Sequence, residues 1–172
     1  LVLKPGARAG VIGVRFQAAG ARALLGMSMA ENTETRLDLT QVWARESESL
    51  LDEVHSAADI KERVRAVERF LIRRLAQSRL LPDTTITHCV EALHAAAGRI
   101  TIDELATRSQ LSGRQLERRF LDEVGIPPRL LASIFRFRRV FDLLEQPQPR
   151  RWVSAALSAG YFDQAHMIRD FK

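Results

Sequence analysis

The sequence predicts a mainly α-helical protein, in which two helix-turn-helix subdomains joined by a linker helix follow a helical segment and a short β remnant. Three observations predict this fold. Residues 102–121 recur at residues 153–172 with apolar side chains on apolar positions. A long amphipathic segment connects the two copies, and short β-type runs are confined to the first 20 residues. Self-similarity at a fixed spacing indicates one structural unit used twice.

Composition places the chain among globular proteins that bind anionic partners. The chain has 172 residues, 46% of them hydrophobic and 27% charged, with a net charge of +5. Residues 99–172 hold 13 Lys and Arg against 9 Asp and Glu, whereas residues 1–98 hold 13 against 12. The repeat-bearing half therefore carries most of the positive field, as a phosphate-binding module requires.

Targeting and redox signals point to the cytoplasm. The apolar runs are far shorter than a membrane span, and no signal peptide is visible. Cys89 is the only cysteine, so the chain cannot form an internal disulfide or a cysteine-rich zinc site. We expect a cytoplasmic, nucleoid-associated protein with no membrane contact, no metal and no cofactor.

The first 20 residues have a β character that the rest of the chain lacks. Leu1–Leu3 and Val11–Phe16 are short β-type runs, punctuated by Pro5 and by glycines. Because two strands do not make a stable sheet alone, we expect the end of a β domain whose earlier strands precede residue 1. The glycines do not follow a phosphate-loop pattern.

Helical periodicity begins after Gly20. The longest segment, Ile60–Gln77, has an apolar stripe of helical period at Ile60, Val64, Val67, Leu71 and Leu75. Its arginines fit a solvated face better than a second nucleic-acid surface. The helices expected in this region are Ala21–Leu25, Leu39–Trp43 with Asp38 as its cap, Glu46–His55, Ile60–Gln77 and Asp83–Ala97.

The first copy of the repeat has the local signals of two short helices. Thr101 with Glu104, and Ser112 with Gln115, are capping boxes. Gly125 closes the second helix. We therefore expect a helix-turn-helix motif at 101–125.

The second copy, at 151–172, aligns with the first at a constant shift of 51 residues. This shift places Ser109 on Gly160 at the turn, Leu111 on Phe162, and Ser112 on the helix cap Asp163. It also places Arg118 on Arg169, at the same outward position of the second helix.

A strong amphipathic helix joins the copies. Pro128–Glu145 carries an apolar stripe at Leu130, Ile134, Phe137, Phe141 and Leu144. Eighteen helical residues span about 27 Å. This length is close to the roughly 34 Å between successive major-groove faces of DNA, so the helix could hold two recognition helices in adjacent grooves.

The repeat-bearing half of the sequence resembles a known family. Ile102–Lys172 is similar to the DNA-binding domain of the AraC/XylS family of bacterial transcriptional regulators, through "IDELATRSQLSGRQLERRFLDEVGIPPRLLASIFRFRRVFDLL" and "WVSAALSAGYFDQAHMIRDFK". Gly160–Lys172 follows the diagnostic run G-[FY]-x-[DS]-[QS]-x-[HF]-[FML]-x-R-x-F-[KR]. "GVRFQAAGARALLG" and "LDLTQVW" more weakly resemble the end of a sensor domain that precedes this module.

The resemblance implies a division into two domains. Residues 1–98 would be the end of an N-terminal sensor or regulatory domain. Residues 99–172 would be the DNA-binding domain, incomplete at its C-terminus because the family continues with a turn and a closing helix. The implied partners are double-stranded DNA, an unknown small-molecule effector bound through the N-terminal domain, and a second copy of the chain.

The resemblance also assigns site residues. In the family, the second helix of each motif enters a major groove, and arginine, glutamine and glutamate there recognise base edges. The base-reading candidates are Arg114, Glu117, Arg118, Gln164, Ala165, His166 and Arg169. The phosphate-contacting candidates are Arg119, Arg136 and Arg139. Since Ala165 removes one polar reader, we expect the first motif to be the stronger contact.

The sequence therefore predicts a sequence-specific, DNA-binding transcriptional regulator. The alternative is an all-helical interaction or dimerisation module, which would bury the outer faces of both second helices. We expect no enzyme and no catalytic residue, because the chain has no G-x-S-x-G, no H-E-x-x-H and no cofactor loop.

Overall fold

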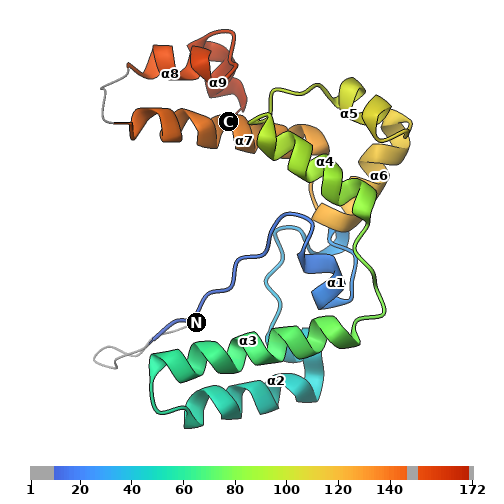
Figure 1. Cartoon of the computed structure of the whole chain (residues 1–172), viewed down its shortest axis with the longest axis vertical. Coiled ribbons are helices and arrows are strands. Elements are labelled where there is room, and N and C mark those ends of the chain that lie inside the picture. The colour runs from blue at the N-terminus through green and yellow to red at the C-terminus, as the bar shows by residue number, and fades with distance from the viewer. Residues whose placement is uncertain (1–9, 147–150, 171–172) are drawn as a thin grey trace. The chain divides into compact units, whose positions relative to one another are not determined.

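The computed structural model describes residues 10–146 and 151–170, and this part of the chain is mainly helical (Figure 1). Two compact units are present. The first comprises residues 10–17 and 37–78 of the described chain, and the second comprises residues 18–36 with those from 79 onward. In chain order the elements are α1 (Ala21–Leu25), the 3-10 turn η1 (Ala30–Asn32), α2 (Leu39–Ser56), α3 (Ile60–Gln77), α4 (Thr84–Ala95), α5 (Ile102–Arg108), α6 (Gly113–Val124), α7 (Pro128–Leu144), α8 (Trp152–Ser158) and α9 (Gln164–Asp170).

The expected β remnant is absent from the described residues. Val11–Phe16 has no regular secondary structure, and Leu1–Leu3 lies outside the described residues. A β-type run needs a partner strand to complete its backbone hydrogen bonds, and no described segment offers one.

The first unit is built on two helices, α2 and α3, that lie side by side (Figure 1). Asp38 caps α2 with a capping box, and Ala44 breaks the helix at φ 42°, between the two helices that the sequence predicts there. The rings of Trp43 and Phe70 meet edge to face with centroids 5.0 Å apart. With Ala66 and Leu50 they form the small core of this unit.

The buried face of α3 differs from the apolar stripe that the sequence indicates. Ile60 is 57% exposed and Leu75 is 53% exposed, whereas Ala66 and Phe70 are buried. Val67 and Leu71 of the stripe are half-buried, so the buried side of α3 lies toward Ala66 and Phe70 rather than along the whole stripe. Ion pairs with α2 hold three arginines of α3, with Arg69 and Arg73 on Glu53 and Arg74 on Glu46. Hydrogen bonds from Arg73 chiefly hold the pKa of Glu53 below its ordinary value.

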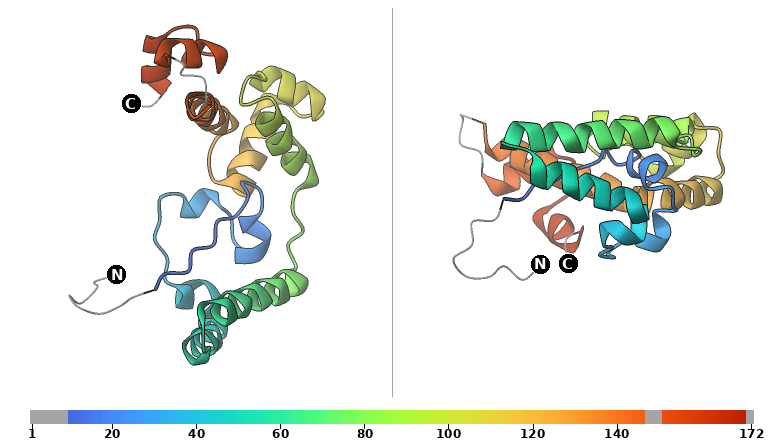
Figure 2. Two further views of the ribbon diagram at one scale, coloured as in Figure 1. Left: turned by 60° about the vertical axis from the view of Figure 1, so that its left-hand side comes forward. Right: turned by 90° about the horizontal axis from the view of Figure 1, so that it is seen from below.

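The second unit has two hydrophobic clusters that share α7. One cluster joins α4, α5 and α6 to the N-terminal half of α7, with Leu116 and Phe120 fully buried. The other joins α8 and α9 to the C-terminal half of α7 through Val140, Leu143 and Met167. Viewed nearly end-on in the left part of Figure 2, α7 runs between the α8–α9 pair and α4.

Residues 18–36 pack against the C-terminal end of α6, although they precede the first unit's helices in the chain. Met29 donates its backbone N–H to the Asp122 carbonyl over 2.9 Å, and the Thr33 hydroxyl donates to the Gly125 carbonyl. These contacts satisfy carbonyls that the end of a helix leaves without partners. The two compact units therefore do not coincide with the 1–98 and 99–172 division that the sequence predicts, because residues 18–36 and 79–98 pack with the C-terminal half.

Glu123 is the buried carboxylate of this contact. Its residue is 1% exposed, it accepts the Asp83 backbone N–H over 3.3 Å, and Arg22 lies 3.4 Å away. Burial raises the pKa of Glu123 above its ordinary value, and the Asp83 N–H and Arg22 offset this only in part.

The raised pKa of Glu123 predicts a pH dependence of stability. Between the unfolded pKa and the raised folded pKa, the native state binds more protons than the unfolded state, so the free energy of unfolding falls as the pH rises through this window. The loss is about 1.4 kcal/mol for each unit between the two pKa values. Glu123→Gln keeps the acceptor for Asp83 and removes the titration. Urea unfolding measures the free energy of unfolding of the variant and of the wild type at pH 5 and pH 8. The variant's value relative to the wild type should be higher at pH 8 than at pH 5. The same difference between the two proteins at both pH values would contradict the assignment.

The linker helix α7 buries a different face from the predicted stripe. Leu130, Ile134 and Phe141 are 44%, 41% and 40% exposed, whereas Leu131, Ala132, Val140 and Leu143 are buried. The two hydrophobic clusters pack against opposite halves of this helix. Its buried face is therefore set by the neighbouring helices rather than by the longest apolar stripe.

Candidate nucleic-acid interface

The outer face of α6 carries the candidate residues of the first helix pair, α5–α6. Ser112 and Gln115 form the expected capping box at the start of α6. The helix buries Leu116 and Phe120, so that Arg114, Glu117 and Arg118 lie on the exposed side. Within the described residues neither Arg114 nor Arg118 forms an ion pair, and both line a shallow depression with Ser112 and Gln115. Two cations are thus available to a ligand on this face.

The outer face of α9 carries the candidates of the second helix pair, α8–α9. The Asp163 carboxylate accepts the His166 backbone N–H over 2.6 Å at the start of this helix. Met167 faces the core, whereas Gln164, Ala165 and Arg169 are exposed. One cation and one amide therefore remain available here.

His166, also a base-reading candidate, contacts groups of its own helix pair. Its Nδ1 accepts the Phe162 backbone N–H over 3.3 Å, and its ring lies edge to face with Tyr161 at 5.3 Å. Its Nε2 lies 4.0 Å from Asp170. Both ring nitrogens therefore face protein groups.

The two helix pairs do not superimpose at one constant shift. In the first pair, Gln110 takes the left-handed conformation at φ 56°, and Leu111 donates its N–H to the Ala106 carbonyl. In the second pair, Gly160 takes that conformation at φ 98°, and Tyr161 donates to Ala156. These positions differ by 50 residues.

The helix caps Ser112 and Asp163 still differ by 51, so the second turn holds one extra residue. The correction places Leu111 on Tyr161, which is buried, rather than on Phe162, which is 85% exposed. Phe162 is that extra residue.

Arg119 forms an ion pair inside the protein, and the phosphate contact expected for it stays a prediction. Its guanidinium donates to both Asp83 carboxylate oxygens, from Nε over 2.7 Å and from Nη2 over 2.6 Å. Asp83 also caps α4 through the Ile86 N–H. The pair fastens α6 to the start of α4, and a phosphate contact would require it to break.

Arg136 is likewise committed within the second unit. Its guanidinium donates to the Gly98 carbonyl, to the Ser133 hydroxyl and to Asp170, and its side chain is 20% exposed. A phosphate contact would break these bonds as well. Arg139 is partly buried, and no contact of this residue counts against the phosphate role expected for it.

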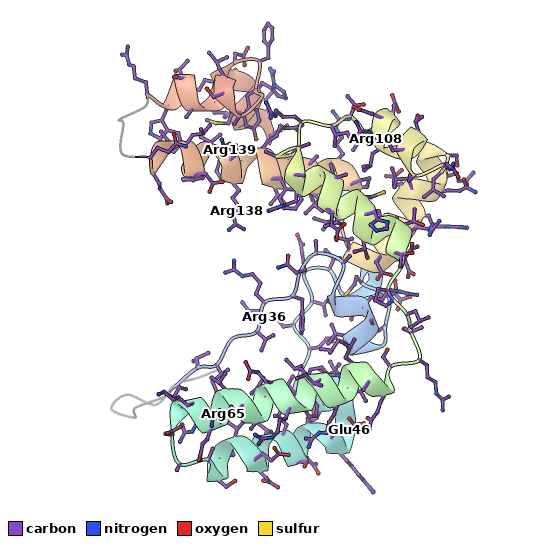
Figure 3. The ribbon with its side chains drawn as sticks, viewed as in Figure 1. Arg36, Glu46, Arg65, Arg108, Arg138 and Arg139 are labelled. Carbon is purple, nitrogen blue, oxygen red and sulfur yellow. The ribbon has the colours of Figure 1, made fainter. Side chains whose placement is uncertain are left out.

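Two exposed side chains near these faces are not among the site residues that the sequence predicts. Arg138 is exposed on α7 and stands out on the side away from α8 and α9 in Figure 3. Phe162 is exposed in the second pair's turn, although the repeat predicts an apolar position equivalent to Leu111 there. The periodicity of α7 gives a signal for Arg138, since it lies between the apolar positions, whereas the exposure of Phe162 depends on the extra residue in the turn.

The described residues also bear on metal sites and on membrane-spanning helices. No group of three or more His, Cys, Asp or Glu side chains in the described ranges could hold a metal ion, and no described helix is long and apolar enough to cross a membrane. Cys89 is buried, and burial raises the pKa of its thiol.

The likeness to the AraC/XylS family stays a prediction carried by the residues quoted for it. Comparisons of the chain with protein-family models, with curated proteins and with solved structures found no match.

Proposed function

We propose that this protein is a sequence-specific, DNA-binding transcriptional regulator, in which the two helix pairs act as helix-turn-helix motifs. In this proposal α6 and α9 enter adjacent major grooves of one duplex, and α7 joins them. Residues of the first unit would belong to a sensor domain for an unknown effector, and the protein would act in the cytoplasm, on the nucleoid.

The outer face of α6 is the observation that carries the proposal. Arg114 and Arg118 lie one helical turn apart on the exposed side, with Glu117 beside them. Arginine forks bind guanine O6 and N7, and glutamate accepts from cytosine N4. The opposite side of the same helix is buried through Phe120, which fixes the direction of this face.

The contrast among the arginines of α6 strengthens the argument. Arg119 is held by Asp83, whereas Arg114 and Arg118 have no ion-pair partner among the described residues. Two unpaired cations on one face raise the local positive potential, which favours a polyanion. An interaction module would cover this face with a partner protein, so sequence-specific DNA binding by this face separates the two functions.

Selection of bound fragments from random duplex DNA tests the function. The full chain should enrich one motif with two half-sites about 10 base pairs apart, one half-site for each recognition helix. Its affinity should fall steeply between 50 mM and 200 mM salt, because Lys and Arg contacts release counterions from the phosphates.

A DNA molecule of scrambled sequence is the control for specificity. Binding to it should be weaker and should show a similar salt slope, since phosphate contacts carry no sequence information. Failure to enrich any motif, together with salt-insensitive binding, would contradict the proposal and favour the interaction module.

A further inference from the structure

The two helix pairs of the second unit have separate hydrophobic clusters, and α7 is the element common to both. Leu131 and Ala132 belong to the first cluster, and Val140 and Leu143 belong to the second. Position 136 lies between these two sets on α7. A polar side chain at this position can reach both pairs.

Arg136 contacts both helix pairs through its guanidinium group. Nη1 donates to the Gly98 carbonyl over 3.0 Å, in the loop that leads to α5. Nη2 donates to Asp170 of α9 over 3.2 Å and to the Ser133 hydroxyl of its own helix over 3.0 Å. The Ser133 hydroxyl in turn donates to Asp170 over 3.1 Å. One side chain therefore ties the start of the first pair to the end of the second.

The backbone segments around Arg136 pack closely, which leaves little room for them to move relative to one another. At Gly98, φ is +71°, and a Cβ atom would come within 2.0 Å of the Ala132 carbonyl oxygen of α7. At Gly160, φ is +98°, and a Cβ atom would come within 3.0 Å of Cγ of Arg99. The loop at 98–99 thus lies against α7 and close to the turn of the second pair.

The surroundings favour a well-defined geometry for this contact. The side chains of Arg136 and Asp170 are 20% and 21% exposed, and the Tyr161 ring lies 5.7 Å from Cζ of Arg136. Charge-assisted bonds from a planar fork are directional, and they are screened less when the pair is partly buried. Loss of either partner would leave the other charge poorly solvated.

We propose that Arg136 and Asp170 are positioning residues that fix the distance and angle between α6 and α9, and thereby set the spacing of DNA half-sites that the protein accepts. This inference rests on the proposed function for its DNA readout. The geometry implies a duplex with two half-sites at one fixed separation, rather than two independently bound sites.

The test uses the selected DNA with its central spacer changed by one or two base pairs. Wild-type protein should lose about 10-fold or more in affinity when the spacing changes, because the second helix then misses its base contacts. Asp170→Asn and Arg136→Gln should weaken binding to the natural spacing and bring the ratio between spacings to within about 3-fold, because the two pairs become free to adjust. Affinity for an isolated half-site should stay the same.

Arg138→Gln is the matched control, since it removes the same charge from the neighbouring, exposed position of α7. It should keep the wild-type ratio between spacings. If both Asp170→Asn and Arg136→Gln, folded by circular dichroism, also keep that ratio, the inference is wrong. Should Arg136→Gln fail to fold, Asp170→Asn carries the test, because it keeps the shape of the side chain.

A measurement without DNA separates this inference from the proposed function. Spin labels at Glu117→Cys and Ile168→Cys report the distance between α6 and α9 in the full chain, while Cys89 is 3% exposed and labels poorly. With the labels in place, the distance distribution should be narrow when Asp170 is present and broader with Asp170→Asn. DNA binding is measured separately on the unlabelled wild type, because Glu117 is a proposed base reader. An unchanged width would overturn the positioning role even if the unlabelled protein binds DNA. A broader distribution with Asp170→Asn, together with no DNA binding by the unlabelled wild type, would keep the positioning role and reject the proposed function.

Discussion

Replacing Phe120 with alanine is expected to lower the free energy of unfolding of the second unit by about 3–5 kcal/mol. The ring is fully buried in the cluster formed by α4, α5, α6 and α7, where Leu93, Leu105 and Leu116 are also buried. Truncation removes its transfer free energy from water and leaves a cavity that packed helices fill only in part. Urea unfolding followed by circular dichroism measures the loss.

Leu130→Ala is the control for this prediction, because Leu130 also lies in the second unit but is 44% exposed. Its cost should stay below about 1 kcal/mol, as expected for a half-exposed side chain. Since small domains are stable by about 5–15 kcal/mol, Phe120→Ala should leave a large share of the second unit unfolded at moderate urea. Equal costs at the two positions would show that Phe120 does not anchor the core.

Arg118→Ala and Arg169→Ala are expected to weaken binding to the selected DNA by about 1–3 kcal/mol each, or roughly 5–150-fold. Each removes an exposed guanidinium from the outer face of a proposed recognition helix. The loss at Arg118 should exceed that at Arg169, because α6 also presents Arg114 and Glu117, whereas α9 presents Ala165. Fluorescence anisotropy with labelled duplex measures both affinities.

The specificity of each variant separates base reading from charge loss. If Arg118 reads a guanine, Arg118→Ala should lose discrimination at one base pair and keep it elsewhere. Arg65→Ala removes one charge from an exposed position on α3, which is neither of the proposed recognition helices, and should change affinity by less than about 2-fold. A uniform loss across all sequences would reassign Arg118 to a phosphate contact.

Helix bounds could be predicted because their signals are local. The expected helix at Ile60–Gln77 matches α3, and Ala21–Leu25 matches α1 with Gly26 in the left-handed conformation. Caps such as Asp38 and Ser112 act within three residues of themselves. The bounds of these helices can therefore be predicted from the local sequence, without knowledge of the tertiary structure.

Buried faces and ion-pair partners could not be predicted in the same way. The apolar stripes of α3 and α7 are wide, so periodicity alone does not select the side that meets a neighbour. The bond from Arg119 to Asp83 joins residues 36 apart in sequence, and that from Arg136 to Gly98 joins residues 38 apart. The sequence indicates a phosphate contact for both arginines and gives no sign of these bonds within the protein. The one-residue insertion at Phe162 was hidden because the flanking apolar positions tolerate either alignment.

The packing of residues 18–36 on α6 limits how this module can be exchanged between proteins. A recombination event or a fusion design that starts at residue 99 would keep α5, α6 and the base-facing arginines. It would discard Met29 and Thr33, which complete the last carbonyls of α6, and Arg22, which lies against the buried Glu123. A chimera would therefore keep the Gly125 cap of α6, but the Asp122 and Gly125 carbonyls and the buried Glu123 would lose these partners. Successful grafts should carry residues 18–36 as well as residues 79–98, even though the whole α2–α3 hairpin separates these two segments in the gene.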